Sequence, residues 1–276
     1  MNKVAQGSIA DRMKENYENR SKTYLTRRIP VIIRLDMKAG SSYTSHFYKP
    51  FDDIYSKTME YTAYNVAKDV QSCRFVYTQS DEISLLLRDD FELNTEAYFD
   101  YNVQKIVSIT SALATYYFNY WMNQFWDSYN RTDYSYTLDK LMREFEINID
   151  KTKLKENSEV YDPYKRPALF DSRAFNIPKE EVCNYFIWRQ QDASRNSIYM
   201  LARSLFSHKE LQGLNGKQLQ DKMFEEKGVN WNDLPTRDKR GMCFYKGNTV
   251  EDRGWNPDEN IPIFTQDRDY IEKFIK

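Results

Sequence analysis

Two aspartates stand at the ends of apolar, β-type stretches of this sequence. Asp36 closes the run 31–36, and Asp81 with Glu82 interrupts the run 74–87. An acidic pair in such a place adds little to a core. Two carboxylates on adjacent strands, with a backbone carbonyl between them, suit the hard oxygen ligation that Mg²⁺ prefers. Such a pair can hold two ions that clamp the attacking and leaving oxygens of a phosphoryl transfer.

The same residues also fit an ordinary structural role. The first aspartate can cap the turn after its strand, and the acidic pair at 81–82 can be hairpin-turn residues. Taken alone, the aspartates favour this simpler interpretation. The lysines around them change the balance, because Lys38 and Lys49 flank the first aspartate and Lys105 begins a predicted helix. A helix N-terminus favours phosphate, so several cations at one edge would make a triphosphate site.

The elements that would position these residues alternate between strand and helix. The run from Val31 is predicted to be a buried strand, and a helix from about Asp52 carries an apolar stripe. Residues 74–87 then form a hairpin and 102–125 a long amphipathic helix. Strand, helix, hairpin, helix is the order of a ferredoxin-like sandwich. We therefore predict an α+β fold with a palm-type antiparallel sheet packed by helices.

The rest of the chain is predicted to complete the same domain. Residues 1–125 form the catalytic core with an N-terminal surface helix over 8–27, 126–165 form a partly disordered insertion rich in Tyr, Asn and charge, and 166–276 form the remainder with a helical C-terminal part and a tail. Within that remainder we expect a return strand over 167–178, the clearest helix over 179–207, shorter helices to Glu226 and a strand over 241–245.

Composition limits the classes of function. Lys and Arg number 40 against 41 Asp and Glu, so the formal net charge of −1 gives no general attraction to nucleic acid, and RNA binding needs a local basic face. The 3 cysteines are far apart and typical of reduced cytosolic thiols. No signal peptide and no long apolar segment is present, which predicts a cytoplasmic protein without a membrane partner. Only 2 histidines argue against a histidine-based metal site or a Ser-His-Asp triad.

Seven short motifs, each weak alone, occur in one order along most of the chain. They are Arg34-Leu-Asp-Met-Lys38, Lys49-Pro-Phe-Asp52, Tyr77-Thr-Gln-Ser-Asp-Glu-Ile-Ser84, Lys105-Ile-Val-Ser108, Phe170-Asp-Ser-Arg173, Trp188-Arg-Gln-Gln-Asp192 with Asn196, and Asn230-Trp-Asn-Asp-Leu-Pro235 ahead of Lys239-Arg-Gly241. In this order the chain resembles the tRNA(His) guanylyltransferase superfamily of 3′–5′ nucleotide-adding polymerases. Within it, the chain is most similar to the bacterial-type guanylyltransferase-like proteins.

The resemblance implies a palm-type nucleotidyltransferase. It places two Mg²⁺ ions on Asp36, Asp81 and the carbonyl of Met37, and it adds Glu82 to the catalytic residues. It also implies that ATP or GTP activates an RNA 5′-monophosphate. The 3′-hydroxyl of an incoming nucleoside triphosphate then attacks the activated 5′ end.

The resemblance further implies contacts to nucleotide and RNA and an assembly. The expected nucleotide-binding residues are Lys38, Ser80, Lys105, Ser108 and Asn196, and the expected tRNA-binding residues are Arg27, Arg28, Arg189, Lys239 and Arg240. The partners would be the 5′ end of a complete or truncated tRNA and nucleoside triphosphates, and the assembly a homotetramer. The polar residues of the helix at 179–207 share one face, which suits either a nucleotide or solvent.

Several positions depart from the family pattern. After the first aspartate the family has glycine, a basic residue, an aromatic and a histidine. Here Met37 places a side chain where none is usual, Gly40 removes the aromatic and Ser41 replaces the histidine. In addition, Ala193-Ser194 stands for a family Cys-His, and Asn102 for an arginine ahead of Lys105. These changes favour a divergent relative, such as a tRNA 5′-end repair enzyme, over a strict histidine-tRNA guanylyltransferase.

Two other functions fit the same residues. One is a palm-fold nucleotide cyclase or small-molecule nucleotidyltransferase, which would need no RNA. The other is a non-catalytic nucleotide- or RNA-binding relative, suggested by the loss of the signature histidines. RNA-dependent incorporation of nucleotide separates the first from the leading prediction, and the effect of Asp81→Ala separates the second.

Overall fold

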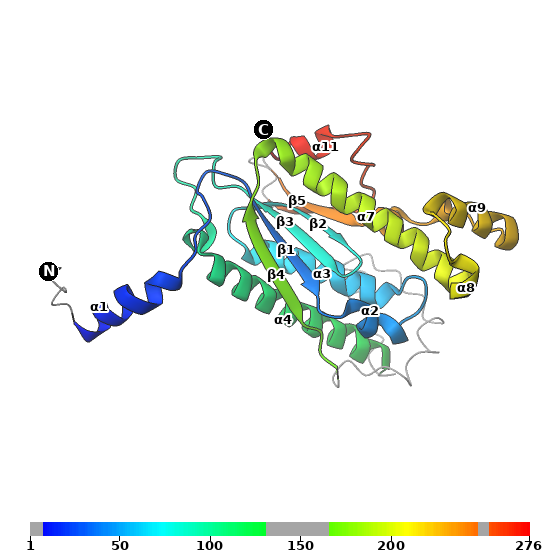
Figure 1. The fold of residues 1–276 in the computed structure, drawn as a ribbon, viewed down its shortest axis with the longest axis horizontal. Helices are drawn as coiled ribbons and strands as arrows, with labels where there is room; N and C mark the ends of the chain where they lie inside the picture. The colour runs from blue at the N-terminus through cyan, green and yellow to red at the C-terminus, as the bar shows by residue number, and fades with distance from the viewer. Residues whose placement is uncertain (1–7, 131–165, 248–253) are drawn as a thin grey trace.

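The computed structural model describes residues 8–130, 166–247 and 254–276, and its centre is an antiparallel sheet (Figure 1). The strands are β1 (Val31–Met37), β2 (Cys73–Gln79), β3 (Glu82–Leu87), β4 (Phe170–Asn176), β5 (Met242–Lys246) and β6 (Trp255–Asp258). Their order in the described residues is β4-β1-β3-β2-β5-β6. The first four strands have the ferredoxin-like order, which confirms the predicted α+β fold class.

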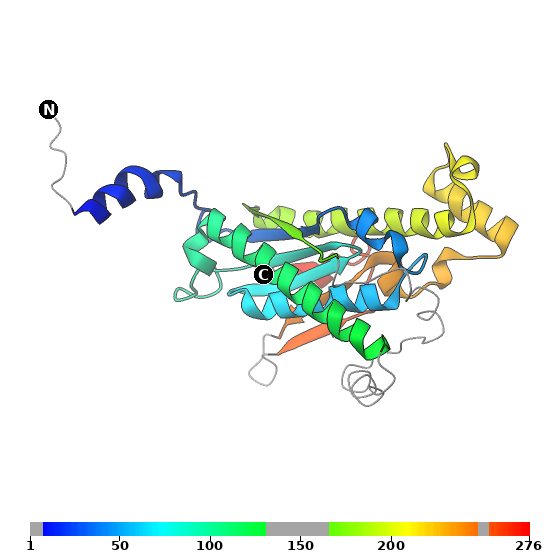
Figure 2. The same cartoon turned by 90° about the horizontal axis from the view of Figure 1, so that it is seen from below.

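Helices cover both faces of the sheet. The α-helices of the described residues are α1 (Ile9–Met13), α2 (Gly40–Tyr43), α3 (Asp53–Asp69), α4 (Val103–Asn130), α7 (Lys179–Leu205), α8 (His208–Leu211), α9 (Gly216–Lys227), α10 (Thr236–Arg240) and α11 (Asp269–Glu272). Figure 2 shows α3 and α4 on one face and α7 on the other. Because side chains alternate along a strand, Ile33 and Leu35 of β1 belong to the α3–α4 core and Ile32 to the α7 core.

The end of α7 carries a small separate core. Leu201 and Phe206 pack there with Leu219 and Met223 of α9. This lobe lies at the end of the molecule opposite α1, which projects away from the body (Figure 1). No helix among the described residues combines the length and apolarity needed to cross a bilayer.

Most predicted elements are present, and three predictions need correction. The single helix over 8–27 is wrong: α1 is followed by a π-helical turn (Lys14–Glu18) and a 3₁₀ turn (Asn19–Ser21), and none of their residues is buried, so no packing extends the helix. The helix predicted over 102–125 runs on to Asn130, and 131–165 lie outside the described residues. The tail forms β6 and α11, which its polar sequence did not indicate.

Candidate functional site

The two aspartates come together at one end of the sheet. Asp36 lies opposite Glu82 of β3 and opposite Asp171 of β4. The backbone N–H of Met37 donates to the carbonyl of Asp81 at 3.1 Å. A hydrogen bond therefore joins the end of β1 to the tip of the β2–β3 hairpin, as the palm-type interpretation requires.

Negative charge accumulates at this junction. Burial raises the pKa of Asp36, and the carboxylates of Asp81 and Asp171 raise it further, while Arg34 and Arg173 act in the opposite direction. Burial also raises the pKa of Asp81. Two poorly hydrated carboxylates that repel one another form a place where a cation would be stabilised.

Gly40 determines where the Asp81 carboxylate lies. A Cβ added at Gly40 would stand 2.1 Å from Oδ2 of Asp81, a distance that no side chain permits. The backbone turns sharply just before it, since Ala39 has a φ of 56°. Gly40 stands where the family pattern has an aromatic residue. In the structure, a larger residue at this position would have to displace the Asp81 carboxylate.

Met37 does not crowd the site, contrary to the expectation from the family pattern. Its side chain is 3% exposed and belongs to the core beneath α3 and α4, where its Sδ accepts a hydrogen bond from the hydroxyl of Tyr55 at 3.9 Å. The reason is the alternation of side chains along β1, which sends Asp36 and Met37 to opposite faces of the sheet. The backbone of Met37 alone stays at the junction.

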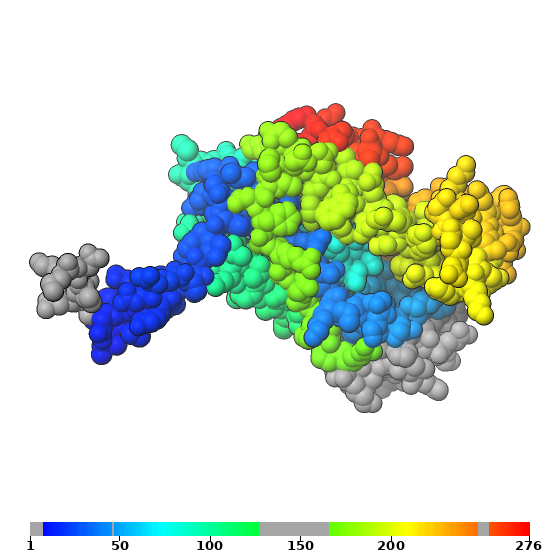
Figure 3. Space-filling view, viewed as in Figure 1, coloured from blue at the N-terminus to red at the C-terminus, as the bar shows by residue number. Residues whose placement is uncertain are grey.

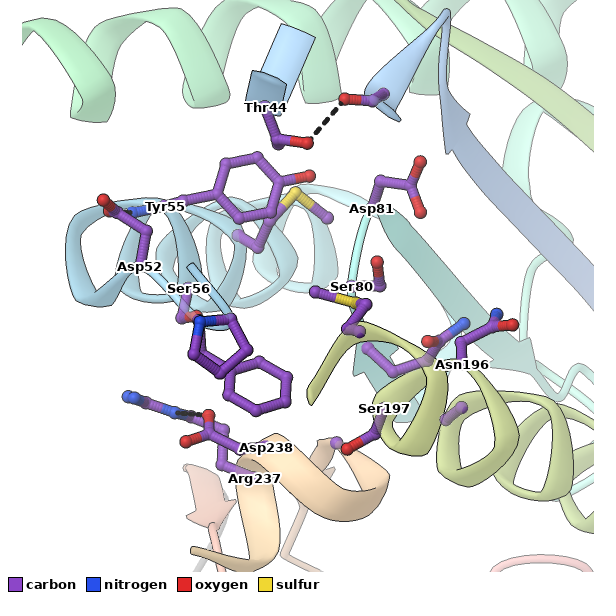
Figure 4. Close-up of a pocket in the computed structure, with 18 of the residues that line it drawn as sticks. Thr44, Asp52, Tyr55, Ser56, Ser80, Asp81, Asn196, Ser197, Arg237 and Asp238 are labelled. Atoms are coloured by element: carbon purple, nitrogen blue, oxygen red, sulfur yellow. Dashed lines mark hydrogen bonds and ion pairs between the residues drawn. The ribbon is translucent and has the colours of Figure 1, made fainter. Parts of the chain in front are cut away.

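A cavity of about 740 Å³ opens beside Asp81. Figure 4 shows its walls: the hairpin tip with Ser80 and Asp81, the start of α3, Asn196 and Ser197 from α7, and Asp238 from α10. Ser80, Asp81, Asn196 and Arg240 are the sequence-predicted residues that line it. Lining residues also bring positive charge to the wall, among them Lys49, Arg195, Arg203 and Arg240.

Carboxylates also line the cavity, and Arg195 is paired with Asp192, but Lys49, Arg203 and Arg240 form no ion pair among the described residues. Nζ of Lys49 donates to the carbonyl of Thr44 at 2.6 Å, and burial lowers the pKa of Lys49. Arg240 donates to the carbonyl of Ile261 at 3.2 Å. Arg203 is exposed and forms no ion pair among the residues that the structure describes. The cavity thus offers positive charge to a polyanion. The sequence motifs contain Lys49 and Arg240 but gave no reason to group them with Arg203.

Glu82 and Arg189 are paired with each other inside the protein. Each is 6% exposed, and Nε of Arg189 lies 2.7 Å from Oε1 of Glu82. A second nitrogen of Arg189 binds Asp192 at 2.9 Å. Burial raises the pKa of Glu82, an effect that the positive charge of Arg189 reduces. In this structure Arg189 is buried against Glu82, so the ion pair supports the site from within, and the expected contact of Arg189 with tRNA stays a prediction.

Arg27 and Arg28 hold a loop of their own chain. Arg27 pairs with Asp89 at 2.9 Å, and the guanidinium of Arg28 donates to the carbonyls of Asp89, Glu92 and Leu93 at 2.6–2.7 Å. Their donors are therefore occupied within the chain, and their expected role as tRNA contacts stays a prediction. The distance in sequence between these partners hides this from motif analysis.

The remaining predicted residues lie outside the cavity. Thr115 of α4 contacts Phe170, next to the aspartates, so Lys105 lies about 15 Å further back along the helix axis. Lys105 and Ser108 are exposed there, and the fold of one chain does not bring them to Asp81. Lys38 is exposed and does not line the cavity. Nζ of Lys239 donates to the carbonyl of Asn232 at 2.5 Å.

The donor set at the junction fits magnesium better than a softer metal. No group of three or more His, Cys, Asp and Glu side chains able to hold an ion occurs within the described ranges. An ion bound by Asp36 and Asp81 would take its other ligands from a backbone carbonyl, water and phosphate. Mg²⁺ is commonly bound in this way, by one or two carboxylates together with a substrate's phosphates.

Comparisons with known proteins point to one family. Residues 10–178 match the family described as tRNAHis guanylyltransferase. A probable tRNA(His) guanylyltransferase of Dictyostelium discoideum is 23% identical over 80% of this chain and 77% of its own length, and an uncharacterized protein of Acanthamoeba polyphaga mimivirus is 26% identical over 86% and 77%. A bacterial tRNA(His) guanylyltransferase-like protein solved with ATP is 39% identical, with a TM-score of 0.77 and coverage of 98% and 99%, and one solved with GTP is 36% identical, with a TM-score of 0.73 over the same shares.

Proposed function

Because this chain belongs to the tRNA(His) guanylyltransferase family and is a nucleotidyltransferase, we propose that it adds nucleotides in the 3′–5′ direction to the 5′ end of tRNA or a similar RNA. The reaction would depend on Mg²⁺, use ATP or GTP and be directed by the opposite RNA strand. The observation that carries this proposal is the meeting of Asp36 and Asp81 beside a cavity lined by cations.

The cavity is proposed to bind the nucleoside triphosphate. Lys49, Arg203 and Arg240 would bind its phosphates, since they carry positive charge on three separate segments of the wall. Ser80 and Asn196 line the same space and would contact the nucleotide through hydrogen bonds. The two bacterial relatives were solved in complex with ATP and GTP, which supports nucleotide binding by this chain.

The aspartates are proposed to act on the reacting phosphate. Asp36, Asp81 and the Met37 carbonyl would hold Mg²⁺, which when bound supplies Lewis-acid stabilisation of the attacking and leaving oxygens. Gly40 leaves the space that the Asp81 carboxylate occupies, and the ion pair of Glu82 with Arg189 links α7 to the strand next to Asp36. In the transfer, a bond forms between the 3′-oxygen of the incoming nucleotide and the 5′-phosphorus of the RNA. The bond to AMP or pyrophosphate breaks.

Labelled-nucleotide incorporation tests this proposal. The purified protein should add nucleotide to a 5′-truncated, monophosphorylated tRNA in the presence of Mg²⁺ and ATP. Asp36→Ala and Asp81→Ala should each abolish incorporation, whereas Asp221→Ala, which removes an exposed carboxylate on α9, should not. Undiminished activity in both site variants would refute the proposed metal site.

The same assay separates the competing functions. Conversion of nucleotide without RNA would favour a cyclase or small-molecule nucleotidyltransferase. Nucleotide binding without turnover in any of these mixtures would favour a non-catalytic relative. The tetramer and the cytoplasmic location stay predictions of the family resemblance.

A further inference from the structure

The face of the sheet that α7 covers is left open along β4. Figure 3 shows β4 and α7 next to one another on the visible surface of the molecule. Arg173 of β4 is exposed, Phe175 is 36% exposed and Trp188 of α7 is 50% exposed. Two arginines and two aromatic rings thus border one open strip, because Arg34 of β1 contacts the Trp188 ring.

The two arginines of this strip lie close enough for their positive charges to repel each other. Arg34 lies directly opposite Arg173 in the β1–β4 register. Directly opposed residues have Cβ atoms about 5 Å apart, and like charges there are destabilising. Nearby carboxylates compensate in part: Arg173 has a 3.8 Å pair with the exposed Asp171, and Asp36 lies within electrostatic reach of both arginines. Arg34 itself forms no ion pair among the described residues. A bound anion such as a phosphate would relieve this repulsion.

Trp188 presents a cation-backed aromatic surface. The guanidinium of Arg189 lies 4.4 Å from the centre of the Trp188 ring, and that of Arg34 lies 5.9 Å away. Tyr185 packs on the ring edge-on at 5.9 Å and is itself fixed by a 2.8 Å hydrogen bond with Ser84. A half-exposed ring held in this way suits stacking with a nucleobase, whose π-face it can cover.

The strip continues from the reacting centre. Arg34 stands two residues before Asp36 on the same face of β1, and Asp171 lies opposite Asp36. The triphosphate cavity lies beside Asp81, and neither Arg34 nor Trp188 is among the residues that line it. The strip is therefore an approach to Asp36 that is separate from the cavity. A local basic face is what a chain with a net charge of −1 needs for RNA.

We propose that Trp188, Arg34 and Arg173 bind one unpaired nucleotide of the RNA substrate. Its base stacks on Trp188, and its phosphate lies between the two arginines. The inference rests on the proposed function, because it assumes that RNA reaches Asp36. A nucleotide inside a duplex has both π-faces covered by its neighbours, so the site selects an unpaired one.

Direct RNA binding tests the site apart from catalysis. The probe is an RNA hairpin whose 3′ strand extends several unpaired nucleotides, including 2-aminopurine, beyond a 5′-monophosphate; a blunt-ended hairpin is the comparison. Trp188→Ala should weaken binding of the extended hairpin roughly five- to tenfold and remove the quenching of 2-aminopurine, while Trp188→Phe keeps both. Arg173→Gln should weaken binding and lower the salt dependence by about one phosphate contact. Tyr116→Ala, an exposed ring on α4, is the control.

Each outcome decides the proposal. If Trp188→Ala and Arg173→Gln bind the extended hairpin as the unaltered protein does, the proposed site is overturned. Equal weakening for the blunt hairpin overturns the selection of an unpaired base. If the protein incorporates no nucleotide but the variants lose RNA affinity, the proposed function fails and this site stands. If incorporation is normal and the variants keep full RNA affinity, the proposed function stands and this site fails.

Discussion

The carboxylate of Asp81 rests against Gly40, at a position where a Cβ on Gly40 would come within 2.1 Å of its Oδ2. This contact joins the segment after β1 to the tip of the β2–β3 hairpin. It means that the geometry of the proposed metal site depends on the absence of a side chain at one residue.

Gly40→Ala should therefore inactivate the enzyme without unfolding it. The added methyl group must push the Asp81 carboxylate aside, and a displacement of about 1 Å at a reacting centre costs roughly a hundredfold in rate. The check is nucleotide incorporation together with thermal unfolding. Gly216→Ala is the matched control, since its Cβ would meet its nearest neighbour at 3.9 Å. Full activity in Gly40→Ala would contradict this account of the site.

The ion pair of Glu82 with Arg189 should contribute strongly to stability. Arg189→Met would leave a buried carboxylate without its partner, at a cost of about 3–5 kcal/mol. The double variant Glu82→Gln with Arg189→Met should lose less than the sum of the two single changes. Urea unfolding measures this cycle. Arg195→Met, whose pair with Asp192 is largely exposed, should cost only about 0–1 kcal/mol. If Arg189→Met reduced the free energy of unfolding by as little as Arg195→Met does, the ion pair would not be important for stability.

Substitution of Lys49 should weaken nucleotide binding, whereas substitution of Lys105 should not. Lys49 lines the cavity and Lys105 lies far back on α4, so Lys49→Met should weaken ATP and GTP binding about tenfold and Lys105→Met should leave it unchanged. Burial lowers the pKa of Lys49, so the fold disfavours its charge, and Lys49→Met should not reduce thermal stability. Calorimetric titration with each nucleotide is the measurement. The reverse pattern would restore the assignment from the family motif and remove the nucleotide from this cavity.

Asp90 should make the stability of the fold depend on pH. Burial opposes its ionisation, but hydrogen bonds from Arg88 and Lys179 prevail and lower the pKa of Asp90 to about 2. The folded-state pKa lies below the unfolded value of about 3.9, so the carboxylate stabilises the fold above that pH. Its contribution is lost as the pH falls toward 2.

Asp90→Asn should accordingly reduce the free energy of unfolding by about 1–2 kcal/mol at neutral pH. The difference from the unaltered protein should shrink as the pH is lowered through this range. Urea unfolding at a series of pH values measures it. Asp269→Asn, which removes an exposed pair with Lys276, should change stability by less than about 1 kcal/mol. A difference for Asp90→Asn that is constant over the whole pH series would refute the argument.

The sequence was sufficient for the elements whose formation depends on neighbours in the chain. Continuous apolar runs predicted β1 and the β2–β3 hairpin, and helical periodicity predicted α3, α4 and α7. The order of these elements then led to the ferredoxin-like sheet and to the meeting of Asp36 with Asp81. Local periodicity failed for residues 8–27, where no apolar stripe packs against the body.

Only the tertiary structure decided what each charged side chain does. Arg27, Arg28 and Arg189 look like RNA contacts in the sequence, yet their partners come from distant segments and occupy their donors. Lys49 and Arg240, far apart in the chain, meet at one cavity. The role of an arginine or lysine is determined by the carboxylates and carbonyls within about 3–4 Å of it, and those neighbours exist only once the sheet and α7 have packed.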